Sequence, residues 1–118
     1  MAISVNNNMG SISIAEAVIA KAVRNEVVKC AGVWGLAEKE GIGKLLKKSS
    51  YYDGIEIEKE KDGSINMDIH IIVCYGANVK SVGETVYNCA CERLKNDLGD
   101  YPFNVSVIIE AVKSEGDE

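Results

Sequence analysis

Residues 55–76, IEIEKEKDGSINMDIHIIVCYG, decide the fold because they encode two strands that pair with each other. Apolar and polar residues alternate on both sides of the central KDG, as in strands with one buried face. A two-residue turn would mix apolar and polar residues on each face. A three-residue loop, Lys61–Gly63 with a left-handed glycine, instead sets Ile57 opposite Met67 and gives one apolar face. The sequence therefore predicts a hairpin with the three-residue loop.

The stretch before the hairpin predicts an amphipathic helix. Ser13–Glu16 reads S-I-A-E, a capping-box pattern in which two side chains satisfy each other's backbone donors. Apolar residues then recur at three- and four-residue spacing as far as Cys30, and Gly32 supplies a stop. This stripe consists of Val18, Ile19, Ala22, Val23, Val27 and Cys30. We expect a short strand next, at Val33–Ala37.

A second helix is expected after the hairpin, from about Asn78 to Leu98. Asn78 or the Ser81–Glu84 pair can cap its start, and Gly99 ends it. Its buried stripe should comprise Val79, Val82, Val86, Ala90, Leu94 and Leu98. Residues 103–112 alternate again and predict a last strand. The side chains expected on one face of that strand are Phe103, Val105, Val107, Ile109 and Ala111.

These elements predict one two-layer α+β domain over residues 11–112. Its mixed β-sheet carries two helices packed on one face, in the order β-α-β-β-β-α-β. Residues 1–10 and 113–118 are polar and aperiodic, so we expect two tails, the second of them acidic. Residues 38–53 are glycine-rich and basic, and are expected to form a long loop. The second face of the sheet must then meet water, this loop or a partner.

The composition is that of an ordinary soluble globular protein, with 118 residues, 47% hydrophobic and 26% charged. The net charge of −5 argues against sequence-independent nucleic-acid binding, which needs a basic surface. It also gives little attraction to anionic lipid. No apolar run approaches the ~18 residues of a membrane helix, and no signal peptide is visible. We therefore expect a cytoplasmic protein without direct membrane insertion.

The only histidine and the four cysteines do not predict a metal site. His70 and Cys74 share one face of a strand but lie ~13 Å apart, too far to bind one ion. Cys89 and Cys91 point about 200° apart on a helix and cannot chelate together. Without a CxxC spacing or a secretion signal, the cysteines are expected to be reduced thiols. A pH-sensitive contact of His70 with Glu56 is the alternative to a plain surface histidine.

No enzyme active site is predicted either. GIGK at residues 41–44 lacks the first glycine and the Ser or Thr of a phosphate-binding loop. The histidine has no Ser or Cys nearby in an activating arrangement, and no cofactor is expected. The basic segment around residue 46 is a candidate docking loop for an acidic partner or a lipid headgroup, and its alternative is a solvated loop whose leucines cap the core. The docking residues are Lys44, Leu45, Lys47 and Lys48.

The sheet face without helices mixes polar residues with apolar ones that a purely wet face would not need. We therefore predict that it binds a partner, and the long loop over residues 38–53 is the alternative cover. The candidate partner-binding face consists of His70, Ile72, Cys74 and Ile108.

Four segments resemble the alkaline shock protein family of Gram-positive bacteria. They are GSISIAEAVIAKAV, GVWGLA, YDGIEIEKEKDGSINMDIHIIVCYGANVKSVGETV and FNVSVIIEAV, and they follow the family's order and spacing over residues 10–112. The resemblance implies a small cytoplasmic protein without known catalysis, linked to alkaline or cell-envelope stress. Some members are held at the membrane by a membrane-embedded partner. Without extended charged tails, this chain looks like the small housekeeping members, which are connected with fatty-acid metabolism.

The sequence therefore predicts a non-enzymatic interaction protein that acts through protein–protein contacts in cell-envelope or alkaline stress homeostasis. A membrane-embedded anchor and a second copy of the chain, giving a homo-oligomer, are the expected partners. The alternative is a regulator of fatty-acid or lipid metabolism that binds a small apolar ligand or a metabolic enzyme. The resemblance places no catalytic residue on this sequence.

Overall fold

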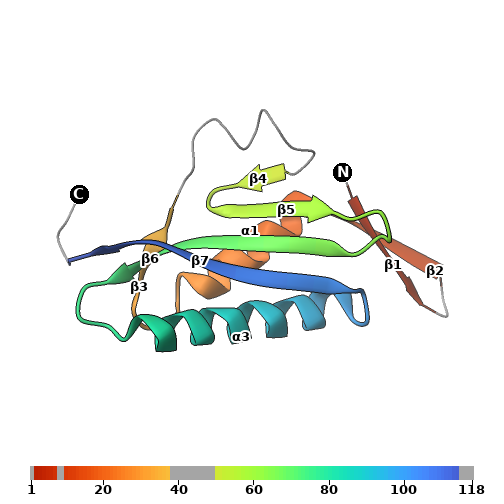
Figure 1. Ribbon diagram of the computed structural model, residues 1–118. Coiled ribbons are helices and arrows are strands. Elements are labelled where there is room, and N and C mark those ends of the chain that lie inside the picture. The colour runs from red at the N-terminus through yellow and green to blue at the C-terminus, as the bar shows by residue number, and fades with distance from the viewer. Residues whose placement is uncertain (1, 8–9, 38–49, 115–118) are drawn as a thin grey trace.

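The computed structural model describes residues 2–7, 10–37 and 50–114. They form an α+β fold in which a mixed sheet carries two helices on one face, as predicted (Figure 1). The elements, in chain order, are β1 (Ala2–Asn7), β2 (Gly10–Ala15), α1 (Glu16–Val27), β3 (Val33–Leu36), β4 (Ser50–Tyr52), β5 (Ile55–Lys59), β6 (Ile65–Cys74), α3 (Val79–Leu98) and β7 (Phe103–Lys113).

The main sheet is organised around β6. Strand β7 pairs in parallel along one edge of β6. Strands β5 and β3 both pair antiparallel with the other edge, β5 beside Ile65–Ile69 and β3 beside Ile71–Val73. Strand β4 extends the sheet beyond β5. Because β6 and β7 are parallel, the chain must cross over between them, and α3 is that crossover.

The hairpin has the predicted register. Ile57 pairs with Met67, and Gly63 has a φ of +93°, the left-handed conformation that the three-residue loop requires. The Asp62 carboxylate accepts hydrogen bonds from the Ser64 backbone N–H at 2.9 Å and the Ser64 hydroxyl at 2.6 Å. These two bonds lower the pKa of Asp62, since they favour its charged form.

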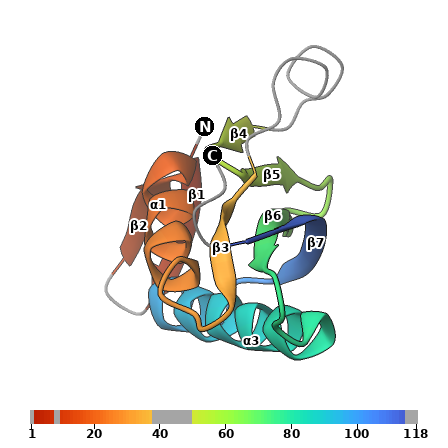
Figure 2. The same ribbon diagram turned by 90° about the vertical axis from the view of Figure 1, so that its left-hand side faces the viewer.

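Both helices cover the same face of the sheet (Figure 2). Helix α1 packs against α3 and lies over β4 and β5, while α3 packs against β7. The predicted helical stripes are buried at Ile19, Val23, Val27, Val82, Val86, Ala90, Leu94 and Leu98. Val18 and Val79 are instead 60% and 40% exposed, Ala22 is half-buried outside the core, and Cys30 is half-buried beyond the end of α1. In the described residues, neither helix is long and apolar enough to cross a membrane. The core is built from Ile3, Ile19, Ala20, Val23, Val27, Ile55, Ile57, Ile65, Met67, Ile69, Ile71, Val73, Val82, Val86, Ala90, Leu94 and Leu98.

The predicted ends of α3 are confirmed, whereas the predicted start of α1 is wrong. The Asn78 side chain accepts a hydrogen bond from Ser81 N at 3.0 Å, and Gly99, with a φ of +63°, ends α3. Ser13 does not cap α1, because it lies in β2 and pairs with Ser4 of β1. Helix α1 begins at Glu16 without a side-chain cap.

The expectation of an N-terminal tail over residues 1–10 is wrong for residues 2–7, which form β1. Strands β1 and β2 make a separate two-stranded sheet at one end of the molecule (Figure 1). An isolated hairpin is marginally stable in water. Here Ile3 is fully buried in the core, and its partner Ile14 packs against that core. The N-terminal strand is therefore part of the domain.

The predicted long loop also contains a strand. Strand β4 pairs with β5 through Ser50 opposite Ile57 and Tyr52 opposite Ile55. The structure thus adds β1 and β4 to the predicted order of elements. The remainder of the expected loop, residues 38–49, lies outside the described residues, as does most of the predicted acidic C-terminal tail. Lys113, the first residue of that predicted tail, is instead the last residue of β7.

Replacing Ile3 with alanine should lower the free energy of unfolding by at least about 2 kcal/mol, because it leaves a cavity in the core. The matched control is Ser4→Ala, which changes the exposed neighbour on the same strand and should stay within about 0.5 kcal/mol of wild type. Urea unfolding followed by circular dichroism measures both. Equal midpoints for the two variants would show that residues 2–7 behave as a tail.

Replacing Gly32 with alanine should cost about 1–3 kcal/mol of stability. Gly32 has a φ of +87°, and a Cβ atom there would lie 2.5 Å from Cγ2 of the buried Val82. Gly35 is the control, because its added Cβ would meet nothing within 4 Å and its φ is not in the left-handed region. A Gly32→Ala variant that melts at the temperature of Gly35→Ala would contradict the assigned contact.

Candidate functional site

The candidate partner-binding face lies opposite the helices, as the strand alternation predicted. His70, Ile72 and Cys74 follow one another at alternate positions of β6, and Ile108 of β7 pairs with His70. Its exposure is not as expected, however. Ile72 is only 8% exposed and His70 only 4%, although both lie on the face without helices. This face therefore offers little accessible apolar surface, and its role in partner binding stays a prediction.

A cation–π contact joins side chains of β3 and β7 near the end of β6. The Lys113 ammonium lies 4.6 Å from the centre of the Trp34 ring, a cation–π contact. Lys113 is the register partner of Cys74, so this contact sits beside the end of β6.

A bulge in β7 sets the position of Glu110. Ile71 pairs with Ile109, but Ile72 pairs with Ala111, so Glu110 is the extra residue. Beyond the bulge the alternation is inverted. The prediction that Ala111 shares the face of the earlier apolar residues is therefore wrong, because it lies on the face of Ile72.

The bulge places a carboxylate against the buried histidine. Glu110 Oε2 lies 2.6 Å from His70 Nδ1, and Glu56 Oε1 lies 3.9 Å from His70 Nε2. The contact with Glu56 was left open by the sequence, and the closer contact with Glu110 was missed. Each ring nitrogen thus has a carboxylate beside it, which orients the imidazole within the sheet face. In residues 2–7, 10–37 and 50–114, no three His, Cys, Asp or Glu side chains are arranged to hold a metal ion.

The candidate docking loop cannot be placed against this face. Lys44, Leu45, Lys47 and Lys48 all lie outside the described residues. Their proposed contact with an acidic partner or a lipid headgroup remains a prediction.

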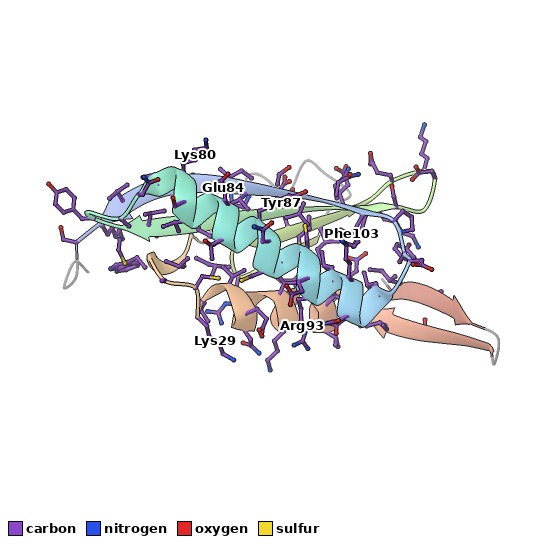
Figure 3. The ribbon with its side chains drawn as sticks, turned by 90° about the horizontal axis from the view of Figure 1, so that it is seen from below. Lys29, Lys80, Glu84, Tyr87, Arg93 and Phe103 are labelled. Carbon is purple, nitrogen blue, oxygen red and sulfur yellow. The ribbon has the colours of Figure 1, made fainter. Side chains whose placement is uncertain are left out.

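A groove of about 500 Å³ between α3 and β7 presents accessible apolar side chains. Three of its side chains are substantially exposed: Val79 at 40%, Tyr87 at 46% and Ile109 at 36%. Figure 3 shows Lys80, Glu84 and Tyr87 along the side of α3 that faces β7. We call this surface the α3–β7 groove, and it is lined by Val79, Lys80, Gly83, Glu84, Tyr87, Asn88, Val107 and Ile109.

The sequence assigned Val79 and Ile109 to the core, so it did not predict this groove. Both residues do belong to the apolar stripes of their elements, but they lie at the boundary between α3 and β7. Among the described strands, β7 pairs only with β6. The signal that could have revealed the groove is the parallel order of β6 and β7, since it makes β7 an edge strand next to its own crossover helix.

A second unexpected contact joins two cysteines. The Cys30 thiol donates a hydrogen bond to Cys89 Sγ at a sulfur–sulfur distance of 3.4 Å. Burial, followed by this hydrogen bond, raises the pKa of Cys30 to about 11. All four cysteines are free thiols and are half-buried. Cys30 and Cys89 lie at the margins of the predicted buried stripes of the two helices. Helices that cover the same face of a sheet touch each other along such margins.

Comparison with known proteins agrees with the resemblance in the sequence. The alkaline shock protein 23 family, described as having a cell envelope-related function, matches residues 4–114. The chain is also similar to the uncharacterized protein YloU of Bacillus subtilis (strain 168). The two are 26% identical over 117 residues, which cover 96% of this chain and 97% of YloU. No solved structure matches. With nearly its whole length matched, this chain belongs to the alkaline shock protein 23 family.

Proposed function

We propose that this protein is a non-enzymatic interaction protein that binds an extended apolar segment of a membrane-anchored partner at the α3–β7 groove. The observation that carries the proposal is the open edge of β7, among the described strands, beside exposed apolar side chains. The cell envelope-related function of the family supports the class of partner. The protein itself would act on the cytoplasmic side of the membrane.

The main chain of β7 can hydrogen-bond a further strand. Ile65 N donates to Pro102 O at 3.2 Å, which sets the phase of the parallel ladder between β6 and β7. In that phase, Asn104 and Ser106 direct their backbone groups toward β6, while Val105 and Val107 direct theirs toward the open edge. An added strand would gain its affinity from these main-chain groups.

The groove beside this edge can receive alternate side chains of the added strand. Gly83 leaves room between the helix and β7, since a Cβ built there would lie 3.7 Å from Ile109 Cδ1. Tyr87 and Val79 border the same space and are exposed. An aromatic ring next to aliphatic side chains is typical of the centre of protein interfaces.

Charge favours a different protein over a second copy. The chain carries a net charge of −5, so two copies repel each other, whereas a basic segment is attracted. Segments that flank membrane helices on the cytoplasmic side are rich in Lys and Arg. An apolar strand next to such a basic flank therefore fits both the groove and the overall charge.

Replacing Tyr87 with glutamate should reduce partner capture at least about tenfold, because a carboxylate in an apolar interface is costly. Immobilised protein would be incubated with detergent-solubilised membranes of the native cells, and retained membrane proteins would be quantified by mass spectrometry. Thr85→Glu is the matched control, since it adds the same charge to an exposed position of α3 outside the groove. It should retain the same membrane protein as wild type.

Capture that is equal for wild type and Tyr87→Glu would refute the groove as the binding site. Circular dichroism must show the same fold for both variants. Light scattering of the purified proteins tests whether a second copy of the chain occupies the groove. A wild-type dimer that Tyr87→Glu converts to a monomer would identify a second copy of the chain in place of the membrane-anchored partner.

A small apolar ligand is the alternative, because the groove volume of about 500 Å³ lies in the range of small-molecule sites. A long-chain fatty acid, added below its micelle concentration, should then raise the melting temperature of wild type but not of Tyr87→Glu. Our proposal predicts no shift in either protein. Differential scanning fluorimetry distinguishes the two functions.

A further inference from the structure

The contact between α1 and α3 brings two thiols almost to bonding distance. Cys30 Sγ and Cys89 Sγ are 3.4 Å apart, and a disulfide requires about 2.0 Å. Cys30 lies in the turn between α1 and β3, where its N–H donates to Val27 O at 3.0 Å and its C=O accepts from Val33 N at 3.2 Å. Closing the remaining distance to Cys89 requires a shift of this turn toward α3.

A pocket of about 150 Å³ gives access to one of the two thiols. Its lining includes Cys89 together with Glu26, Glu92, Arg93 and Asn96, but not Cys30. Figure 3 shows Arg93 on the side of α3 that faces α1. The two carboxylates outnumber the single guanidinium, so a small neutral reagent is favoured over an anion. Such a reagent meets Cys89 first.

Access and burial assign different roles to the two residues. Cys30 Sγ lies between two acceptors, Cys89 Sγ at 3.4 Å and the backbone oxygen of Glu26 at 3.6 Å. The pKa of Cys30 is raised to about 11, and that thiol keeps its proton at neutral pH. Cys89, which lines the pocket, is therefore the more accessible thiol of the pair for an incoming reagent.

We propose that Cys30 and Cys89 form an oxidisable pair whose substrate is a small neutral hydroperoxide, with Cys89 as the thiol that is oxidised first and Cys30 as the resolving thiol. With hydrogen peroxide, Cys89 gives up its proton, its sulfur attacks one peroxide oxygen and the O–O bond breaks. A sulfenic acid forms, and the released hydroxide takes up the Cys89 proton as the first water molecule. The Cys30 sulfur then attacks the Cys89 sulfur. The S–O bond breaks, and the hydroxyl group leaves with the Cys30 proton as water. In sum, two thiols lose two electrons and hydrogen peroxide becomes two water molecules.

The disulfide would join the turn after α1 to the middle of α3, across 59 positions of sequence. It would add a covalent link between the end of α1 and α3, the two helices that cover one face of the sheet. This inference does not depend on the partner proposed for the α3–β7 groove, since the pocket at Cys89 shares no lining residue with that groove.

The test uses the purified, fully reduced full-length chain and hydrogen peroxide. After treatment, free thiols are alkylated with iodoacetamide, and intact mass and non-reduced peptide maps are recorded. We expect two of the four thiols to become resistant to alkylation and the linked peptides to contain Cys30 and Cys89. The control Cys91→Ser removes the other cysteine in the same part of α3 and should form the same link.

The order of the two steps is tested with dimedone, which traps sulfenic acids. Cys30→Ser should accumulate dimedone on Cys89, whereas Cys89→Ser should take up little label on Cys30 at the same peroxide dose. The proposal is overturned if all four wild-type thiols remain alkylatable or if the link joins another pair of cysteines. Preferential labelling of Cys30 would overturn the assigned roles.

Discussion

The fold depends on the burial of β6 beneath both helices. Met67, Ile69, Ile71 and Val73 project from one face of this strand and are fully buried. Burying such a side chain contributes about 1.5–3 kcal/mol relative to exposure. Because β6 also pairs with β3 and β5 on one edge and with β7 on the other, its register determines where the rest of the sheet lies.

Local periodicity predicted two kinds of element. The β5–β6 hairpin joins two strands that are neighbours in the sequence, and helix α3 has a recognisable capping residue, Asn78. The periodicity missed β4, which has only three residues, and β1, whose length and polar end do not resemble a buried strand. The site contacts were missed for another reason. His70 and Glu110 are 40 positions apart, and no pattern within one strand or helix encodes such a distant pairing.

The exposure of apolar side chains differs from what the alternation of polar and apolar residues predicted. The flat outer face of the sheet is closed around His70 and Ile72, whereas the boundary of α3 and β7 leaves aromatic and aliphatic side chains exposed. An edge strand lends itself to recognition because its main-chain groups are already held in line. Recognition at an edge would leave the His70–Glu110 contact undisturbed behind the sheet.

The parallel pairing of β6 with β7 also has a consequence for folding during synthesis. Asn66 and Asn104 are register partners 38 positions apart, with the whole of α3 between them. Strand β5 can pair with β6 as soon as the hairpin leaves the ribosome, but the opposite edge of β6 stays unpaired until β7 has been made. During this interval β6, whose side chains form much of the core, has one unpaired edge. A chaperone or a strand of another chain could bind that edge at this stage.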